Sequence, residues 1–132
     1  MTEAKPEFLN NQPFPRLMGV DVVEASKTCV RARLVVRPDL CTAANILHGG
    51  AIMAFADTLG AIGAWLNLPD GALTTTIESK TNFIGAAKEG STVTAESTPF
   101  HVGKRSSVWQ TKIMTEDGKL VAVVTQTQMV LT

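Results

Sequence analysis

The stretch from residue 45 to residue 57, NILHGGAIMAFAD, contains the features from which the fold and the function of this chain are predicted. It places His48, Gly49 and Gly50 directly before an apolar run and ends on a single carboxylate, Asp57. Two adjacent glycines weaken a helix, and a buried carboxylate without a partner costs free energy. A helix that only fills a core needs neither feature, so both are candidates for function.

The apolar run predicts one helix over residues 49–67, which ends before the turn sequence PDG at 69–71. The helix is apolar on nearly every face, so other elements must enclose it. It also contains a group of small residues that would let strands or a second helix approach closely: Gly60, Ala61, Gly63 and Ala64.

Strands are predicted on both sides of this helix. Two precede it, at residues 17–24 and 29–36, and four follow it, at 73–83, 91–101, 105–115 and 119–132. The short connections among the last four imply antiparallel pairing. A helix of about 19 residues and strands of about ten have similar lengths. We therefore predict an α+β fold, with a six-stranded antiparallel sheet wrapped around one long central helix. Residues 1–16 form an N-terminal arm, and residues 17–132 form a single domain.

The bulk composition argues against several classes of protein. The chain has 132 residues, of which 45% are hydrophobic, as expected for one packed domain. Twelve Lys and Arg balance twelve Asp and Glu, so nothing indicates a nucleic-acid or membrane partner. The polar N-terminus lacks the apolar core of a signal peptide, and Cys29 and Cys41 form neither a disulfide framework nor a zinc pattern. We expect a cytoplasmic protein without a metal or cofactor.

The motif at residues 48–50 lies at the predicted helix N-terminus, where free N–H groups could hold a polarised carbonyl oxygen. Asp57 is either partly exposed, or satisfied by a local donor such as the Thr58 hydroxyl, or a desolvated carboxylate that is placed as a nucleophile or general base. Gly50 and Asp57 are about 10 Å apart along one helix, too far to act on the same carbonyl. Two antiparallel copies could bring these groups together, so an acyl-transfer site predicts a dimer with two shared sites.

These features resemble the hotdog-fold acyl-CoA thioesterases, and most closely the PaaI-type (phenylacetate-degradation) subfamily. The resemblance covers residues 17–132 and rests on Asn45, His48-Gly49-Gly50 and Asp57, together with the order of elements and the chain length. It implies hydrolysis of an aryl- or fatty-acyl-CoA to a free acid and CoA. It also implies a homodimer with shared sites that pairs into a tetramer.

The resemblance further implies roles for the matching positions. The Gly50 N–H would bind the thioester oxygen, and Asp57 of the second copy would attack the carbonyl carbon or activate water. Asn45 would position the water or the thioester, and His48 would orient the loop or contact the sulfur side of the thioester.

The same resemblance implies further contacts outside this motif. A threonine near the start of the strand after the helix would help to hold the water: Thr76 fits best, with Thr74 and Thr75 as alternatives. The hairpin between the fourth and fifth strands would bind the CoA nucleotide through its glycine and its basic residues. The hairpin candidates for substrate binding are Gly103, Lys104, Arg105 and Ser106, and Gly49 of the His48-Gly49-Gly50 motif is a further candidate.

Two alternatives from other classes remain open. A hydratase or dehydratase of the same fold carries an Asp-x-Asn-Pro-x-His pattern, which residues 42–48, TAANILH, lack. A non-catalytic acyl-CoA-binding or sensor protein can keep the fold and lose the acid, and the presence of Asp57 argues against it. The chain has no G-x-S-x-G sequence and only two histidines, His48 and His101, which disfavours a Ser-His-Asp triad.

Overall fold

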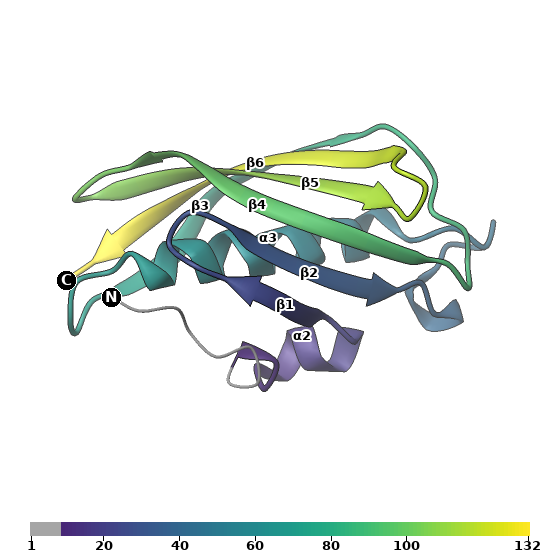
Figure 1. Ribbon diagram of the computed structural model, residues 1–132, viewed down its shortest axis with the longest axis horizontal. Helices are drawn as coiled ribbons and strands as arrows, with labels where there is room; N and C mark the ends of the chain where they lie inside the picture. Colours follow the sequence, from purple (N-terminus) through teal and green to yellow (C-terminus); the bar gives the residue numbers. More distant parts are fainter. Residues whose placement is uncertain (1–8) are drawn as a thin grey trace.

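The computed structural model describes residues 9–132, which form one antiparallel sheet with a long helix across its inner face (Figure 1). The strands lie in the order β1-β2-β4-β5-β6-β3, and the predicted α+β architecture is confirmed. In chain order the elements are α2 (Pro13–Met18), β1 (Asp21–Ala25), β2 (Val30–Val35), the short 3-10 helix η1 (Pro38–Leu40), α3 (Gly49–Leu66), β3 (Leu73–Phe83), β4 (Thr92–Val102), β5 (Ser106–Thr115) and β6 (Leu120–Leu131).

The core lies between the sheet and α3. One face of α3 is buried through Phe55, Leu59 and Leu66, each no more than 2% exposed. Burying a side chain of this size contributes about 1.5–3 kcal/mol, so the contact between the helix and the sheet holds the fold together. By length and composition alone α3 could also cross a membrane, but a helix buried in a globular core passes the same test.

The chain differs from the prediction at its N-terminal end. The first strand begins at Asp21 rather than at residue 17, because residues 13–18 form the helix α2. Pro13 opens this helix, and Gly19 follows it with a φ of +88°, which is the usual placement of these two residues. Leu9 is buried in the core together with Met18, so the segment predicted as an arm, residues 1–16, packs against the domain at least at Leu9.

The short connections predicted antiparallel pairing among the last four strands, and this was wrong for β3 with β4. β3 and β4 are consecutive, yet β3 pairs with β6 at one edge of the sheet while β4 lies between β2 and β5. Residues 84–91 join them around one end of the sheet (Figure 1). The other side of β3 pairs with no strand among residues 9–132, so this edge is open.

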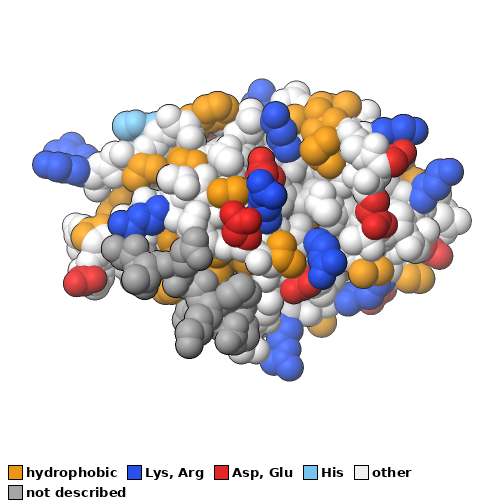
Figure 2. All heavy atoms as spheres, viewed as in Figure 1, with side chains coloured by type: hydrophobic (Ala, Val, Ile, Leu, Met, Phe, Trp, Pro, Cys, Tyr) orange, Lys and Arg blue, Asp and Glu red, His pale blue; other side chains and the backbone are white. Residues whose placement is uncertain are grey.

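The outer face of β1, β2 and β4 carries paired charges. Arg31 lies 2.8 Å from Glu96 and Arg33 lies 3.1 Å from Asp21, all with side chains about half exposed. Figure 2 shows positive and negative side chains mixed across this face rather than separated by sign. Surface pairs of this kind contribute about 0–1 kcal/mol each, so they add little to the stability of the fold.

The centre of α3 lies very close to the sheet. A Cβ added at Gly63 would come within 2.5 Å of the ring of Trp109, which is itself fully buried. Only a residue without a side chain fits at this contact.

We therefore expect Gly63→Ala to destabilise the protein by about 1–3 kcal/mol through overpacking against Trp109. The expected sign is opposite to that of helix propensity, which favours Ala over Gly by about 1 kcal/mol within a helix. Urea unfolding followed by circular dichroism measures the change. An increase in stability would show that the Trp109 ring moves aside at little cost.

Candidate active site

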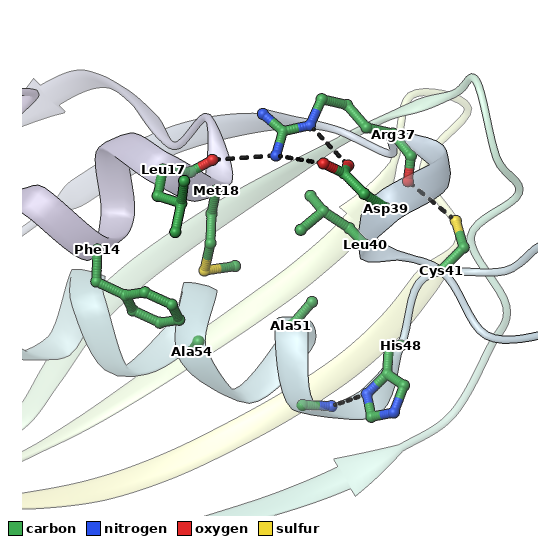
Figure 3. A pocket seen from close by; sticks show the side chains of 11 residues that line it. Phe14, Leu17, Met18, Arg37, Asp39, Leu40, Cys41, His48, Ala51 and Ala54 are labelled. Atoms are coloured by element: carbon green, nitrogen blue, oxygen red, sulfur yellow. Dashed lines mark hydrogen bonds and ion pairs between the residues drawn. The ribbon is translucent and has the colours of Figure 1, made fainter.

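The N-terminus of α3 carries the predicted glycines and a histidine cap. His48 precedes the helix, and its Nδ1 accepts a hydrogen bond of 2.8 Å from the Gly50 N–H (Figure 3). Gly49 lies against the ring of Phe83, which a Cβ at that position would meet at 3.1 Å. The predicted oxyanion donor is therefore at the helix N-terminus, but a substrate oxygen would have to displace the exposed imidazole of His48 from it.

Asp57 is half-buried in the middle of α3 and is held by two donors from the sheet. Its Oδ1 accepts a hydrogen bond of 2.8 Å from the Thr76 hydroxyl and one of 3.1 Å from the Gln126 side-chain amide. The Thr58 hydroxyl donates instead to the carbonyl of Ala54 at 2.8 Å, so the alternative in which Thr58 satisfies Asp57 locally is wrong. Asp57 is thus a partnered carboxylate whose partners come from β3 and β6.

The structure distinguishes the three candidate threonines on β3. Thr76 contacts Asp57 directly. Thr74 instead donates to the carbonyl of Met129 at 2.8 Å and accepts from Gln128 at 3.1 Å, while Thr75 is exposed. Side chains alternate between the faces of a strand, which is why Thr74 and Thr76 face the helix and Thr75 does not.

Two functional candidates, Gln126 and Gln128, were missed at the sequence level. Both are 1% exposed and lie on the core face of β6, where Ala122 and Val124 are also buried. The signal was present in the alternating sequence TQTQ at 125–128, because two amides on the core face of a strand need buried partners. What they bond to could not be read from the sequence.

Two grooves flank Asp57 along α3. The first, the His48 groove, has a volume of about 410 Å³, and Figure 3 shows Phe14 and Met18 of α2 pointing toward Ala51 and Ala54 of α3. The second, the Trp65 groove, has a volume of about 430 Å³ and lies beside the C-terminal half of α3. Within residues 9–132, the residues that line it are all uncharged: Leu9, Asn11, Gln12, Ala61, Ile62, Trp65 and Thr74.

The His48 groove is the more polar of the two. At its rim the Arg37 guanidinium pairs with Asp39 at 3.0 Å and donates to the carbonyl of Leu17 at 3.0 Å (Figure 3). Cys41 also lines this groove. Partial burial raises the pKa of the Cys41 thiol, and the carboxylates of Glu89 and Asp39 raise it further. The thiol therefore stays protonated at neutral pH and is a poor nucleophile.

The remaining predicted residues lie away from Asp57 within one chain. Asn45 is exposed and has a φ of +62°, a conformation that Asn adopts more readily than most residues. Gly50 begins the helix about two turns before Asp57. One chain therefore brings Asp57 and Thr76 together, but it does not bring either of them to Asn45, His48 or Gly50.

The predicted CoA-binding hairpin is present between β4 and β5. Position 103 requires a glycine, because a Cβ there would come within 2.7 Å of the His101 imidazole. Lys104 and Arg105 are exposed and form no ion pair with any described residue. Ser106, at the start of β5, is opposite Met129 of β6 in the sheet, and Met129 is opposite Thr75 of β3 on its other side. The hairpin thus begins at the end of the sheet where Thr74 and Thr76 lie.

Within residues 9–132, no group of three or more His, Cys, Asp or Glu side chains is arranged to hold a metal ion.

Comparisons with known proteins bear on this arrangement. Residues 44–122 match the family model described as the thioesterase superfamily. The 1,4-dihydroxy-2-naphthoyl-CoA thioesterase 2 of Arabidopsis thaliana is 31% identical over 114 residues, which are 86% of this chain and 71% of that protein. The crystal structure of thioesterase HI1161 from Haemophilus influenzae is similar with a TM-score of 0.90 and 26% identity, over 98% of this chain and 92% of that one. The E. coli PaaI protein, from the phenylacetic acid degradation operon, shares the fold with a TM-score of 0.87 at 20% identity, over 96% and 89% of the two chains.

Proposed function

This chain belongs to the thioesterase superfamily, and from that premise we propose that it hydrolyses an acyl-CoA thioester, with Asp57 as the catalytic carboxylate. One observation carries the assignment of Asp57: it is a half-buried carboxylate with one oxygen held by Thr76 and Gln126, and it lies between two grooves. A thiolate is a good leaving group, so a carboxylate and an oxyanion donor suffice without a Ser-His-Asp triad.

We propose that two copies share each site. Most of the exposed or half-buried residues of α3 form one stripe at helical spacing, Gly50, Met53, Ala54, Asp57, Ala61 and Trp65, and its small members allow a second helix to approach closely. The open edge of β3 adjoins this stripe, since Thr76 of β3 bonds to Asp57 of α3. Open strand edges favour pairing with another chain, so a second copy can cover both features at once.

In an antiparallel pair of α3 helices, Gly50 of one copy lies opposite Asp57 of the other. The thioester oxygen would then accept a hydrogen bond from Gly50 N–H once the His48 imidazole has moved away. Asp57 would take a proton from water as the water oxygen bonds to the carbonyl carbon. Collapse of the tetrahedral intermediate breaks the C–S bond, and the proton passes to the CoA thiolate. Direct attack by Asp57, through an acyl-enzyme anhydride that water then hydrolyses, gives the same products.

We propose that the Trp65 groove binds the acyl group. It begins at Ala61, one helical turn after Asp57, and none of the described residues that line it is charged. Its volume of about 430 Å³ is within the usual range of about 300–1,000 Å³ for ligand pockets. Lys104 and Arg105, which form no ion pair with the part of the chain that the structure describes, offer contacts for the CoA phosphates. These features favour an acyl group with a ring or a chain of several carbons over acetyl.

A panel of acetyl-, hexanoyl-, benzoyl- and phenylacetyl-CoA, assayed for release of free thiol, tests the proposed function. We expect hydrolysis of the larger substrates, with kcat/KM at least about tenfold above that for acetyl-CoA. Trp65→Ala should lower kcat/KM for the larger substrates by about tenfold, because an indole wall contributes apolar contact area, and should leave acetyl-CoA nearly unchanged.

Trp65→Phe is the matched control, since it keeps an aromatic wall and should retain most of the activity. Gel filtration of both variants separates a groove effect from a loss of the dimer. The absence of thiol release from every substrate would contradict the proposed function. An equal fall of kcat/KM for all substrates in Trp65→Ala would show that the acyl group does not bind in the Trp65 groove.

A further inference from the structure

Gln126 and Gln128 are unusual occupants of the core face of β6. A buried amide costs free energy unless its polar atoms are paired, and both side chains are 1% exposed. Apolar residues of similar volume would fill this space without that cost. The hydrogen bonds of the two amides therefore need an explanation other than packing.

The two amides form a chain of hydrogen bonds with a single direction. An ionised carboxylate only accepts, so the NH₂ end of Gln126 faces Asp57 Oδ1, at 3.1 Å. The same NH₂ group donates to Gln128 Oε1 at 2.9 Å. The NH₂ end of Gln128 must then face away from Asp57, and it donates to the Thr74 hydroxyl at 3.1 Å. Gln128 thus fixes the orientation of the Gln126 amide, and the Gln126 amide faces Asp57.

This chain distinguishes the two oxygens of Asp57. Oδ1 accepts from Gln126 and lies 2.8 Å from the Thr76 hydroxyl, whose single proton is shared with Gln128 Oε1 at 2.5 Å. No described residue donates to Oδ2. The Gln126 NH₂ group also lies 3.4 Å from the main-chain carbonyl of Asp57, so it contacts both the side chain and the backbone of that residue. Oδ2 is consequently the oxygen left for water or a carbonyl carbon.

The fit of Gln126 against α3 carries its own cost. A Cβ at Gly60 would come within 2.2 Å of Gln126 Oε1, so a glycine is needed to admit the amide. Oε1 itself is buried without a hydrogen-bond partner among residues 9–132, which typically costs about 1–3 kcal/mol. An arrangement that costs stability at two points is better explained by what the NH₂ group does at Asp57 than by stability.

We infer that Gln126 is a positioning residue: together with Thr76 it holds Oδ1 of Asp57 so that Oδ2 faces the substrate, and Gln128 fixes the orientation of its amide. The inference rests on the proposed thioesterase function. It concerns the step that Asp57 performs, so a loss of Gln126 should affect turnover and leave substrate binding nearly intact.

Gln126→Met is the direct test, because Met keeps the length and volume of the side chain and removes the donors. We expect kcat for the best acyl-CoA substrate to fall about 10- to 100-fold, as expected when a reacting group is misplaced by an ångström or less. KM should change by less than about threefold. Gln128→Met, one step further from Asp57, should lower kcat less, and it provides a second measurement if Gln126→Met folds poorly.

Thr111→Val is the matched control, since it removes the buried Thr111–Ser97 hydrogen bond of 2.9 Å elsewhere on the same sheet. It should keep the wild-type kcat. In an Asp57→Asn background, Gln126→Met should cause no further fall in kcat, because a residue that acts through Asp57 has nothing left to position.

The outcomes separate this inference from the proposed function. If Asp57→Asn abolishes turnover while Gln126→Met and Gln128→Met keep the wild-type kcat, the positioning role is wrong and the thioesterase assignment stands. A further fall of kcat in the double variant would also overturn the positioning role. If the wild-type protein hydrolyses no acyl-CoA, or if Asp57→Asn is fully active, both proposals fail.

Discussion

Asp57→Asn is expected to lower kcat for the best acyl-CoA substrate by at least about 100-fold, within the range of about 10²–10⁴ that general acid–base catalysis contributes. Asn can place its carbonyl oxygen where Oδ1 now accepts from Thr76 and Gln126. The substitution therefore leaves the local hydrogen bonds in place and changes only the atom at the Oδ2 position. The measurement is release of free thiol at saturating substrate, with gel filtration to show that the oligomer is unchanged.

The same variant distinguishes the enzyme from a non-catalytic acyl-CoA sensor. Calorimetric titration of Asp57→Asn with the best substrate should give a Kd close to the wild-type KM, since the substitution does not alter the grooves. A wild-type protein that binds acyl-CoA tightly without releasing thiol would favour the sensor. Unchanged hydrolysis by Asp57→Asn would remove Asp57 from the mechanism.

Gly50→Pro is expected to lower kcat about 100- to 1,000-fold, which is the usual effect of removing one oxyanion-hole donor. Proline deletes the N–H itself, and the first turn of a helix tolerates it because these N–H groups have no partner within the helix. Gly49 precedes it and has no Cβ to clash with the ring. The His48 imidazole must leave its present position, which its exposure allows.

Gly50→Ala is the control for the loss of the N–H, because it keeps the donor. Its Cβ would lie 3.1 Å from His48 Nδ1, a contact that rotation of the imidazole relieves. We expect it to retain far more activity than Gly50→Pro. Equal activity of Gly50→Pro and the wild type would show that a different group binds the thioester oxygen.

Mixing the two inactive variants tests whether the site is shared between copies. If Gly50 of one copy serves Asp57 of the other, a hybrid dimer of Gly50→Pro and Asp57→Asn contains one site with both changes and one intact site. Random reassortment of symmetric dimers then leaves about a quarter of all sites intact. Thiol release should rise to about that fraction of the wild-type rate after mixing under mild denaturation. A mixture that stays inactive, although hybrids form, would place both groups in the same chain.

Much of this protein could be predicted from local sequence. The extents of α3 and of β3 to β6 followed from periodicity and turn residues, which act over a few positions. The isolation of Asp57 on an apolar helix, and the His-Gly-Gly sequence before that helix, were equally visible. The N-terminal helix was missed because its six residues, PFPRLM, are too few for a periodic pattern, although Pro13 and Gly19 marked its ends.

The sequence by itself determined the fold class, the central helix and the single acid on it, because each of these depends on residues that are neighbours along the chain. Only the tertiary structure decided which groups hold that acid. Gln126 follows Asp57 by 69 positions, and it reaches Oδ1 only because β6 lies beneath α3 at Gly60. Thr76, rather than Thr75, meets Asp57 because the pairing of β3 with β6 sets which side chains face the helix. Such register is fixed by contacts between distant segments, and no local pattern contains it.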